Sequence, residues 1–472
     1  MNGLGIAYRG VLWVVFALLL VPKVGLAQEF ETGKAGMSPI GASGVEALLD
    51  DVSGGEVSLK AAIQSAMDDN PEFLSGKHAA AVSHEAYLQS YGALLPQLDF
   101  VARGGYALRH NDTTEAMYSG GDGDAWTNEE RVVLSQLLFD GGLTYSKVAA
   151  DKLHSESRRE ELFNTAEDVG LSATQYFMEV IRTRAVVELC QRNIAEHEKL
   201  AELTRIRLEG GGGTQADVTQ AQAALEEARS RLVQAGQAAE DAEAGYIRFF
   251  GAKPGALAMP DRPAHVVPQG EDAAVSQAAA GNRALKAARL AEQQKEREVD
   301  SAKGRMMPKV QVKLAAGRAD NTGGYTADYY DASAMLELSF NLFSGGSDAA
   351  AIRKAKADRL KAEQDALGVQ REVEEDMRTA WSFYRATGRL LSVLRSLTDE
   401  NAQVVTSYTD QFRMGQRSLV DLVSAQKSLF SSQQVYLNGM AAHTFSHYRL
   451  CAPASRLMEI LGVDLRVEEI AD

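Results

Sequence analysis

Two long helical patterns near the C-terminal end of the chain are separated by the sequence Gln411-Phe412-Arg413-Met414-Gly415-Gln416-Arg417-Ser418-Leu419-Val420-Asp421-Leu422. Glycine is a poor helix former, and the helical pattern stops at Gly415 and resumes at about Leu419. A similar break at 209–214 separates two earlier helical patterns. We therefore expect both breaks to be the tips of helical hairpins, with Gly211 and Gly415 in matching places.

The chain repeats its own organisation, because both halves show the same order of features. Each has a helical segment, a proline, two alternating segments, a Phe-x-Gly-Gly corner, a long helical segment, a glycine break and a last helix. Equivalent residues lie 204 positions apart: Phe139 and Phe343, Gly211 and Gly415, Asp217 and Asp421. Pro96 and Pro308 lie 212 apart, which a longer first strand-to-strand loop explains. The pattern indicates an internal duplication.

Two segments in each half alternate between apolar and polar residues, as a strand with one apolar face does. We expect strands at about 97–109, 125–138, 309–319 and 329–341. A closed transmembrane barrel has at least eight strands, and an open sheet edge leaves backbone groups unpaired in lipid. Strands that span a membrane here therefore require several chains. The polar face has small residues at Gly105, Gly317 and Ser333, which favours an open lumen.

Helical segments fill the remainder of two predicted repeats, at 58–251 and 272–462. A proline-rich connector at 252–271 joins them, and 463–472 is a C-terminal tail. Each repeat opens with a helical segment, at about 58–94 with a break at Asn70-Pro71, and at 272–305. Long helices are predicted at about 143–209 and 348–413, followed by helices at about 215–250 and 419–450. A helix of some 65 residues spans roughly 100 Å.

The N-terminal part is predicted to contain an export signal and a leader. Residues 1–27 have the layout of a signal peptide, with Arg9, an apolar run at 11–21 and small residues that end at Ala27. Residues 28–57 are rich in Gly and Ser, and we expect a flexible leader there. No later stretch approaches ~20 apolar residues, so the exported chain is expected to lack a transmembrane helix.

Composition argues against several classes of function. The formal net charge is −15, with 64 acidic against 49 basic residues, which disfavours nucleic acid as a partner. Cys190 and Cys451 are too few and too far apart for a disulfide framework or a metal cluster. His443 and His447 lie four apart but lack a third ligand. Without a nucleophile elbow or a phosphate loop, we expect no catalytic residues, no metal site and no cofactor.

Five motifs together resemble the TolC-like outer-membrane channel proteins of bacterial export systems, over essentially the whole mature chain. They are Leu94-Leu95-Pro96-Gln97-Leu98, Leu134-Ser135-Gln136-Leu137-Leu138-Phe139-Asp140-Gly141-Gly142, Ala216-Asp217-Val218-Thr219-Gln220-Ala221, Leu342-Phe343-Ser344-Gly345-Gly346 and Gly415-Gln416-Arg417-Ser418-Leu419-Val420-Asp421. The resemblance implies a mainly α chain with transmembrane β. Its long antiparallel hairpins would form a periplasmic α-barrel in a homotrimer. Its four strands would contribute to a 12-stranded β-barrel in outer-membrane lipid.

The resemblance also implies a gate, because the hairpin tips would lie at the periplasmic entrance. In the family, tip aspartates line the closed entrance, so Asp421 would form an acidic ring with its copies. Asp217 occupies the matching place in the first hairpin. Arg417 would tie neighbouring hairpins together by bonding toward the loop around Ala216 and Asp217. Phe412 stands where a latch tyrosine is often found and Ser424 where a second ring aspartate can occur, so a weak latch and a single acidic constriction are expected.

The other tip residues would contact a periplasmic adaptor protein that connects the channel to an inner-membrane pump. They are Gly211, Gly213, Thr214, Gly415, Gln416, Ser418 and Leu419. Residues 411–438 look most like the outer-membrane components of type I protein secretion, whose pump is an ABC exporter. The alternative is drug or metal efflux with a proton-driven pump. A trimeric coiled-coil adhesin or spacer, and an adaptor, are disfavoured by the four strands and the duplication.

Overall fold

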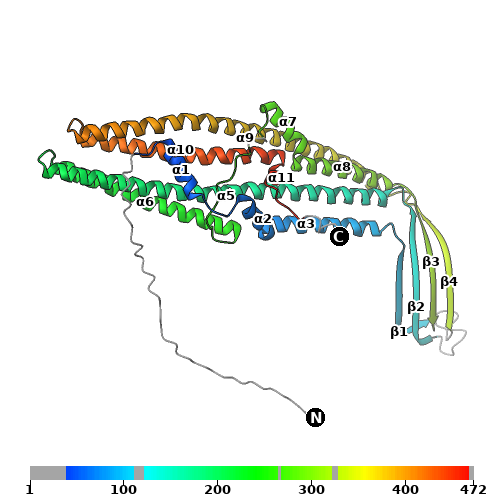
Figure 1. Ribbon diagram of the computed structural model, residues 1–472. Helices are drawn as coiled ribbons and strands as arrows, with labels where there is room; N and C mark the ends of the chain where they lie inside the picture. The colour runs from blue at the N-terminus through cyan, green and yellow to red at the C-terminus, as the bar shows by residue number, and fades with distance from the viewer. Residues whose placement is uncertain (1–38, 111–121, 264–266, 322–327, 467–472) are drawn as a thin grey trace, which may run out of the picture. The chain divides into compact units, whose positions relative to one another are not determined.

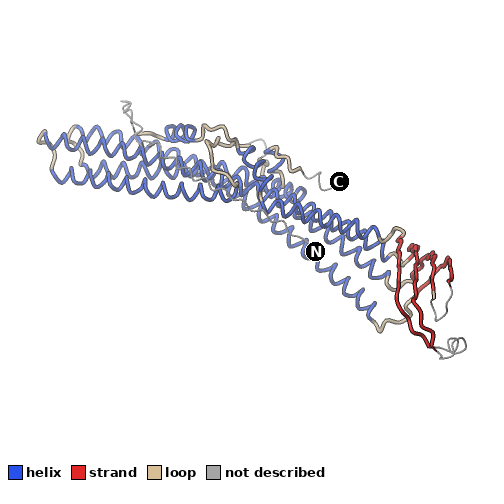
Figure 2. The backbone as a smooth tube through the Cα atoms, turned by 90° about the horizontal axis from the view of Figure 1, so that it is seen from below, coloured by secondary structure: helices blue, strands red, loops and turns tan. Residues whose placement is uncertain are grey.

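The computed structural model describes residues 39–110, 122–263, 267–321 and 328–466. These residues form long helices with a sheet at one end (Figure 1; Figure 2). Helices α5 (Leu143–Glu209) and α9 (Ser347–Arg413) each have 67 residues and turn back into α6 (Gln215–Phe250) and α10 (Leu419–Cys451). Both turns lie at the end away from the sheet (Figure 1). Among the described helices, none is long and apolar enough to cross a membrane.

Two pairs of shorter helices open the repeats. They are α2 (Leu59–Asp69) with α3 (Pro71–Gly92), and α7 (Glu271–Gly281) with α8 (Arg283–Gly304). Their bounds are all 212 positions apart. The prediction of one helix at 272–305 is therefore wrong at Asn282. Its extended backbone ends α7, its side chain accepts from the N–H of Leu285, and its amide donates to the carbonyl of Pro453 at 2.9 Å.

The predicted flexible leader is also wrong in its second part, because α1 (Ala42–Val52) forms there. Val45, Leu48 and Leu49 repeat at helical spacing and are buried. The N–H of Ala42 donates to Asp399 of α9 at 2.8 Å, which fastens the start of the helix. The predicted signal peptide at 1–27, the leader up to 38 and the tail beyond 466 lie outside the described residues.

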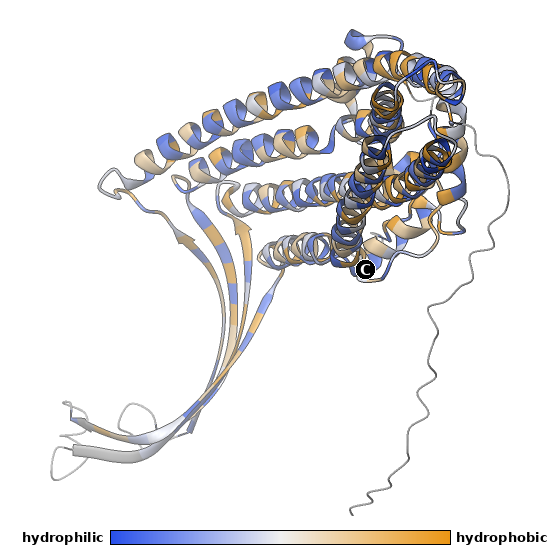
Figure 3. Cartoon of the chain, turned by 90° about the vertical axis from the view of Figure 1, so that its left-hand side faces the viewer, coloured by the Kyte–Doolittle hydropathy of each residue, from blue (hydrophilic) through white to orange (hydrophobic). Residues whose placement is uncertain are grey.

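The four strands form one antiparallel sheet in the order β1-β2-β3-β4. They are β1 (Gln97–His110), β2 (Asp122–Phe139), β3 (Lys309–Asp320) and β4 (Asp328–Ser339), with an irregularity between Leu137 and Phe139. The sheet curves away from the helices (Figure 3). The predicted fold class is confirmed, since the chain is mainly helical, duplicated and carries four strands.

One face of this sheet is apolar and exposed within the single chain. The register pairs Leu98 with Leu134 and Phe100 with Val132, and Leu98 and Phe100 are about two-thirds exposed. Exposed aromatic residues stand at both ends of this apolar band: Tyr106, Trp126 and Tyr330 near the strand-to-strand loops, and Phe139, Phe340 and Phe343 near the helices. An apolar band between two aromatic girdles is the pattern of strands that face lipid.

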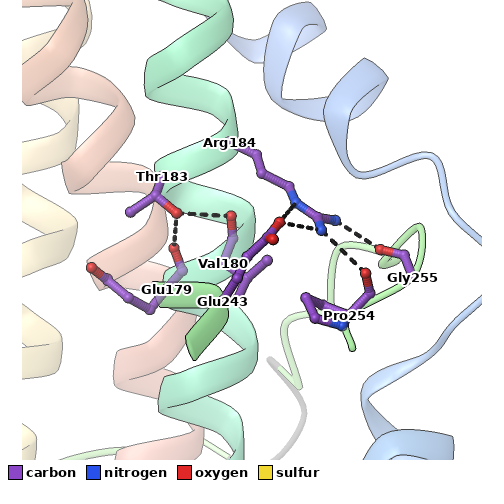
Figure 4. A network of polar contacts seen from close by, with 7 residues as sticks. All are labelled: Glu179, Val180, Thr183, Arg184, Glu243, Pro254 and Gly255. Atoms are coloured by element: carbon purple, nitrogen blue, oxygen red, sulfur yellow. Dashed lines mark hydrogen bonds and ion pairs between the residues drawn. The ribbon is translucent and has the colours of Figure 1, made fainter. Parts of the chain in front are cut away.

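A polar network fixes the base of the first hairpin (Figure 4). The guanidinium of Arg184 on α5 donates to Glu243 of α6 at 2.6 and 3.0 Å. The same group donates to the carbonyls of Pro254 at 3.2 Å and Gly255 at 2.7 Å in the connector. Thr183, the neighbouring residue, bonds back to its own helix at Glu179. Arg184 therefore holds α6 and the chain that leaves it against the side of α5.

The apolar core around the middle of α5 contains a buried carboxylate. Glu167 is 6% exposed and accepts the backbone N–H groups of Leu457 at 2.8 Å and Met458 at 3.3 Å, at the start of α11 (Leu457–Leu461). Burial raises the pKa of Glu167 to about 7 from an ordinary value of 4.5. The folded chain therefore binds a proton here at pH values where the unfolded chain has released it.

We predict a pH-dependent cost from this buried carboxylate. Because the folded pKa is the higher one, the free energy of unfolding should fall as pH rises from 4.5 to about 7, by on the order of 3 kcal/mol. Glu167→Gln should remove this part of the slope in thermal unfolding measured from pH 4.5 to 8. The exposed residue Glu156 on the same helix serves as control, and a Glu167→Gln slope equal to that of Glu156→Gln would contradict the prediction.

Candidate functional site

The two hairpin tips have the same backbone structure. In each, the N–H of the tip glycine donates to the carbonyl three residues back at 3.0 Å, and the next N–H donates to the carbonyl five residues back at 2.8 Å. Gly211 and Gly415 both have φ of +75°, a conformation that strains other residues. The duplication thus extends to the hydrogen bonds of the turns, and the glycines are needed for the backbone itself.

The tip aspartates close the N-terminal caps of the returning helices. The hydroxyls of Thr214 and Ser418 accept from the N–H groups of Asp217 and Asp421, each at 3.2 Å. In return, the carboxylate of Asp217 accepts from the N–H and hydroxyl of Thr214, and that of Asp421 accepts from the hydroxyl of Ser418 at 2.8 Å. The side chain of Asp421 nevertheless stays 47% exposed. Both carboxylates therefore have a local structural role and still reach solvent.

Arg417 folds back onto its own hairpin. Its guanidinium lies over the ring of Tyr408 at 3.9 Å, and its Nε donates to Gln411 at 3.1 Å. The nearest carboxylate oxygen of Asp421 is 3.9 Å away. The contacts that the structure gives for Arg417 thus lie within the second hairpin rather than at Asp217. Tyr408 is the aromatic partner that the sequence prediction missed.

Arg207, which the sequence prediction also missed, joins the two hairpins at their tips. It projects from the end of α5, and its guanidinium lies 4.4 Å from the ring of Phe412 on α9. It donates to the carbonyl of Phe412 at 2.8 Å and to that of Gly212 at 3.0 Å. The equivalent residue of the second repeat is Gln411, which is uncharged. A charge present in only one of the two matching turns is the sequence signal that could have identified Arg207.

Some predicted tip residues are exposed and some are buried. Phe412 and Leu419 are only 3% and 2% exposed, since both pack into the apolar core between the hairpins. They are therefore core residues, and the expectation of an entrance or adaptor-facing surface at these two positions is corrected. Four predicted positions are half-buried: Gly213, Asp217, Arg417 and Asp421. The remaining ones are exposed: Gly211, Thr214, Gly415, Gln416, Ser418 and Ser424. Ile206, Met414 and Val420 add exposed apolar side chains that were not predicted.

A second tie between the hairpins lies further along the helices. The ammonium of Lys427 on α10 is 2.5 Å from Glu227 on α6, and Arg231 contacts the same carboxylate at 2.8 Å. Lys427 is also the main reason that the pKa of Glu227 is lowered. Arg231 and Lys427 border a hollow of about 420 Å³ between α5, α6 and α10. The two hairpins of one chain are therefore joined by charge at two levels.

The histidines and cysteines are packed within the helices. His443 stacks on Tyr384, and His447 lies edge-on to the same ring. Burial lowers the pKa of His443 to about 4 and raises that of Cys451 to about 12. Cys190 and Cys451 are both free and buried. Within the described ranges, no group of three or more His, Cys, Asp or Glu side chains is arranged to hold a metal ion.

Comparison with known proteins gives a family match over most of the chain. A family described as outer membrane efflux protein matches residues 62–251 and 274–446. The outer membrane efflux protein BepC of Brucella suis is 26% identical over 377 residues, which is 80% of each chain. The alkaline protease secretion protein AprF of Pseudomonas aeruginosa is 24% identical over 392 residues, or 78% of each chain.

Solved structures share the fold at low identity. The CmeC outer membrane channel of Campylobacter jejuni has a TM-score of 0.74 at 12% identity and covers 97% of this chain and 98% of its own. The outer membrane protein VceC of Vibrio cholerae has a TM-score of 0.72 at 16% identity and covers 86% of this chain and 97% of its own. These similarities show a common arrangement of hairpins and strands.

We predict that Arg207 stabilises the closed packing of the two tips. Arg207→Ala removes a cation–π contact and two hydrogen bonds to carbonyls, so the free energy of local opening should fall by about 1–2 kcal/mol. Hydrogen exchange of the amides at Gly212, Gly415 and Gln416 measures this opening.

Arg205 provides the matched control for Arg207. It lies on the same helix, and its ion pairs are with Glu202 and Glu209 of that helix. Arg205→Ala should leave the exchange of the tip amides unchanged. Equal exchange in the Arg207→Ala and Arg205→Ala proteins would mean that Arg207 does not hold the tips together.

Proposed function

Because the chain belongs to the outer membrane efflux protein family, we propose that it is the outer-membrane exit duct of a tripartite export system whose cargo is protein. Membership makes it an outer-membrane channel and a passive protein rather than an enzyme. The proposed function has three further parts: a homotrimeric assembly, a gate at the hairpin tips, and partners in the periplasm and inner membrane.

The edges of the sheet support a homotrimer. β1 and β4 are the outer strands, so each has a row of backbone groups that lacks a partner strand within the described chain. Such rows are too costly to leave in lipid, and β4 of one chain can pair with β1 of the next. Two chains give eight strands, which leave a filled interior, whereas three give twelve and leave a passage. The apolar band then faces lipid and the polar face lines the lumen.

The hairpin tips then lie at the periplasmic entrance and form the gate. Arg417, held over Tyr408, is one-third exposed on the second hairpin, where a neighbouring chain would meet it. Asp421 keeps half of its side chain exposed, and three copies would make an acidic ring. Asp217 adds a carboxylate from the first hairpin. Ser424, exposed nearby on α10, carries no charge, so the ring is single.

The exposed tip surface supports docking of a periplasmic adaptor. Met414, Val420 and Ile206 are more than half exposed and lie beside the polar tip residues. Apolar side chains rimmed by polar residues are common at protein interfaces. The adaptor would connect the duct to an inner-membrane ABC exporter. This pairing and the protein cargo are supported by the similarity to AprF, which is named for alkaline protease secretion.

Drug or metal efflux with a proton-driven pump is the second candidate function. BepC, named as an efflux protein, matches 80% of the chain at 26% identity, against 78% of the chain at 24% identity for AprF. The fold serves both candidates, so the cargo has to be measured.

Deletion of the gene from its native host separates the two functions. We expect specific proteins to disappear from the culture supernatant of the deletion strain and to return when the wild-type gene is restored. Minimum inhibitory concentrations of detergents, dyes and metal salts provide the second readout. An unchanged supernatant together with increased susceptibility would replace protein secretion by efflux.

The gate is tested by single-channel recordings in planar bilayers. Arg417→Ala should raise the conductance of the resting channel, because the guanidinium no longer holds the tips closed. Asp421→Asn should weaken block by a trivalent cation in the same recordings, because the acidic ring is lost. Arg413→Ala, which loses an exposed ion pair with Asp410, is the control. Conductance and block equal to those of the control would contradict the gate.

A further inference from the structure

A row of alternating charges crosses the polar face of the sheet. Arg103 on β1 contacts Glu129 on β2 at 3.1 Å, and the other oxygen of Glu129 lies 3.6 Å from Arg131. Arg131 in turn reaches Asp331 on β4 at 3.1 Å. The side chains of Glu129, Arg131 and Asp331 are about one-third exposed, which is low for charged groups on a sheet face with nothing packed on it. We call these four residues the ion-pair row.

The row depends on a glycine in the strand between. The register places Gly317 of β3 directly between Arg131 and Asp331. A Cβ atom at Gly317 would lie 3.2 Å from the carboxylate of Asp331 and 3.1 Å from the carbonyl oxygen of Glu130. Because glycine has no side chain there, the guanidinium of Arg131 can reach across β3 to Asp331. Gly317 therefore allows an ion pair between strands that are not neighbours.

The described side chains of the polar face are balanced in charge, although the chain is not. The register positions of this face hold four acidic and four basic described side chains: Asp99, Glu129, Asp331 and Glu337, and Arg103, Arg131, Lys309 and Lys313. Lys313 and Glu337 form a second cross-strand pair at 2.7 Å. The whole chain carries a formal charge of −15. The described side chains of this face are therefore neutral in sum, although the amino-acid composition of the whole chain is acidic.

We propose that the ion-pair row is a specificity determinant of the channel: it keeps the lumen of the strand section neutral and holds its long side chains against the wall. The proposal rests on the proposed function, which turns the polar face inward. Three copies of the row would ring the lumen with six positive and six negative groups. A ring of one sign would retain segments of opposite charge, whereas paired charges let segments of either sign pass. This property suits a polypeptide cargo, which carries both signs along its length.

The potential at the row can be measured with a cysteine placed beside it. Gly105 lies on the polar face, one same-face position from Arg103, and a Cβ there meets nothing within 4 Å. Both native cysteines are buried, so Gly105→Cys supplies the accessible thiol. A cationic and an anionic methanethiosulfonate reagent of similar size are each added to intact cells for a series of times. The trimers are then purified, and the extent of modification measured by mass gives the two reaction rates. The ratio of the two rates reports the local charge without depending on the periplasmic gate.

In the Gly105→Cys background, Glu129→Gln should raise the anionic-to-cationic rate ratio by about threefold, since one unit charge is lost at about 7 Å. Asp331→Asn should raise it as well, and Arg103→Gln should lower it. Glu130→Gln is the matched control, because Glu130 follows Glu129 directly but lies on the opposite face. Its ratio should stay at the value of the background.

Two results overturn the proposal in different ways. If Glu129→Gln, Asp331→Asn and Arg103→Gln leave the ratio unchanged, or if Glu130→Gln changes it equally, the ion-pair row does not set the charge of the lumen. If Gly105→Cys reacts with neither reagent in trimers that form normally, the polar face does not line a passage. That second result contradicts the proposed function itself, and with it the inference.

Discussion

The backbone groups along the outer edges of β1 and β4 are the constraint on which the architecture depends. A four-stranded sheet with one apolar face cannot lie in lipid alone, because its edge N–H and C=O groups would lack partners there. Duplication supplies two strand pairs and two hairpins in one chain, and each strand pair comes with its own long hairpin. Edge pairing between chains therefore also brings the hairpins together. Strand pairing in the membrane thus sets the arrangement of the helices outside it.

Repetition and periodicity were enough to predict the strands and the long helices from the sequence. The absence of proline over α5 and α9, and the alternation at Leu98 to Leu108, gave helices and strands close to those observed. The cap at Asn282 was missed because its following residue is Arg283, where the first repeat has Pro71. The common offset of 212 positions would have revealed it. The helix α1 was missed because its partners lie far away in the sequence, such as Asp399, which accepts the backbone N–H of Ala42.

At the tips, contacts between the two hairpins decide which residues are buried, and the sequence pattern of one hairpin does not predict these contacts. Phe412 and Leu419 are apolar residues in a tight turn, and their burial follows from the contact between two hairpins that are far apart in the sequence. Arg207 acts across the same contact, and no spacing within one hairpin predicts it. Asp217 and Asp421 were predicted for their charge, yet the structure gives both a capping role as well. Single residues here combine local stability with an exposed surface.

The equal length of α5 and α9 restricts how this protein can evolve. Both have 67 residues, so both helices span the same length, roughly 100 Å, from their first residue to the turn. Inserting one residue in either helix would advance its turn by about 1.5 Å and rotate it by roughly 100°. The Arg207 contact and the common level of the tips would then be lost together. Changes in length are therefore tolerated only when both halves acquire them, and a family of such ducts should vary in reach by matched steps.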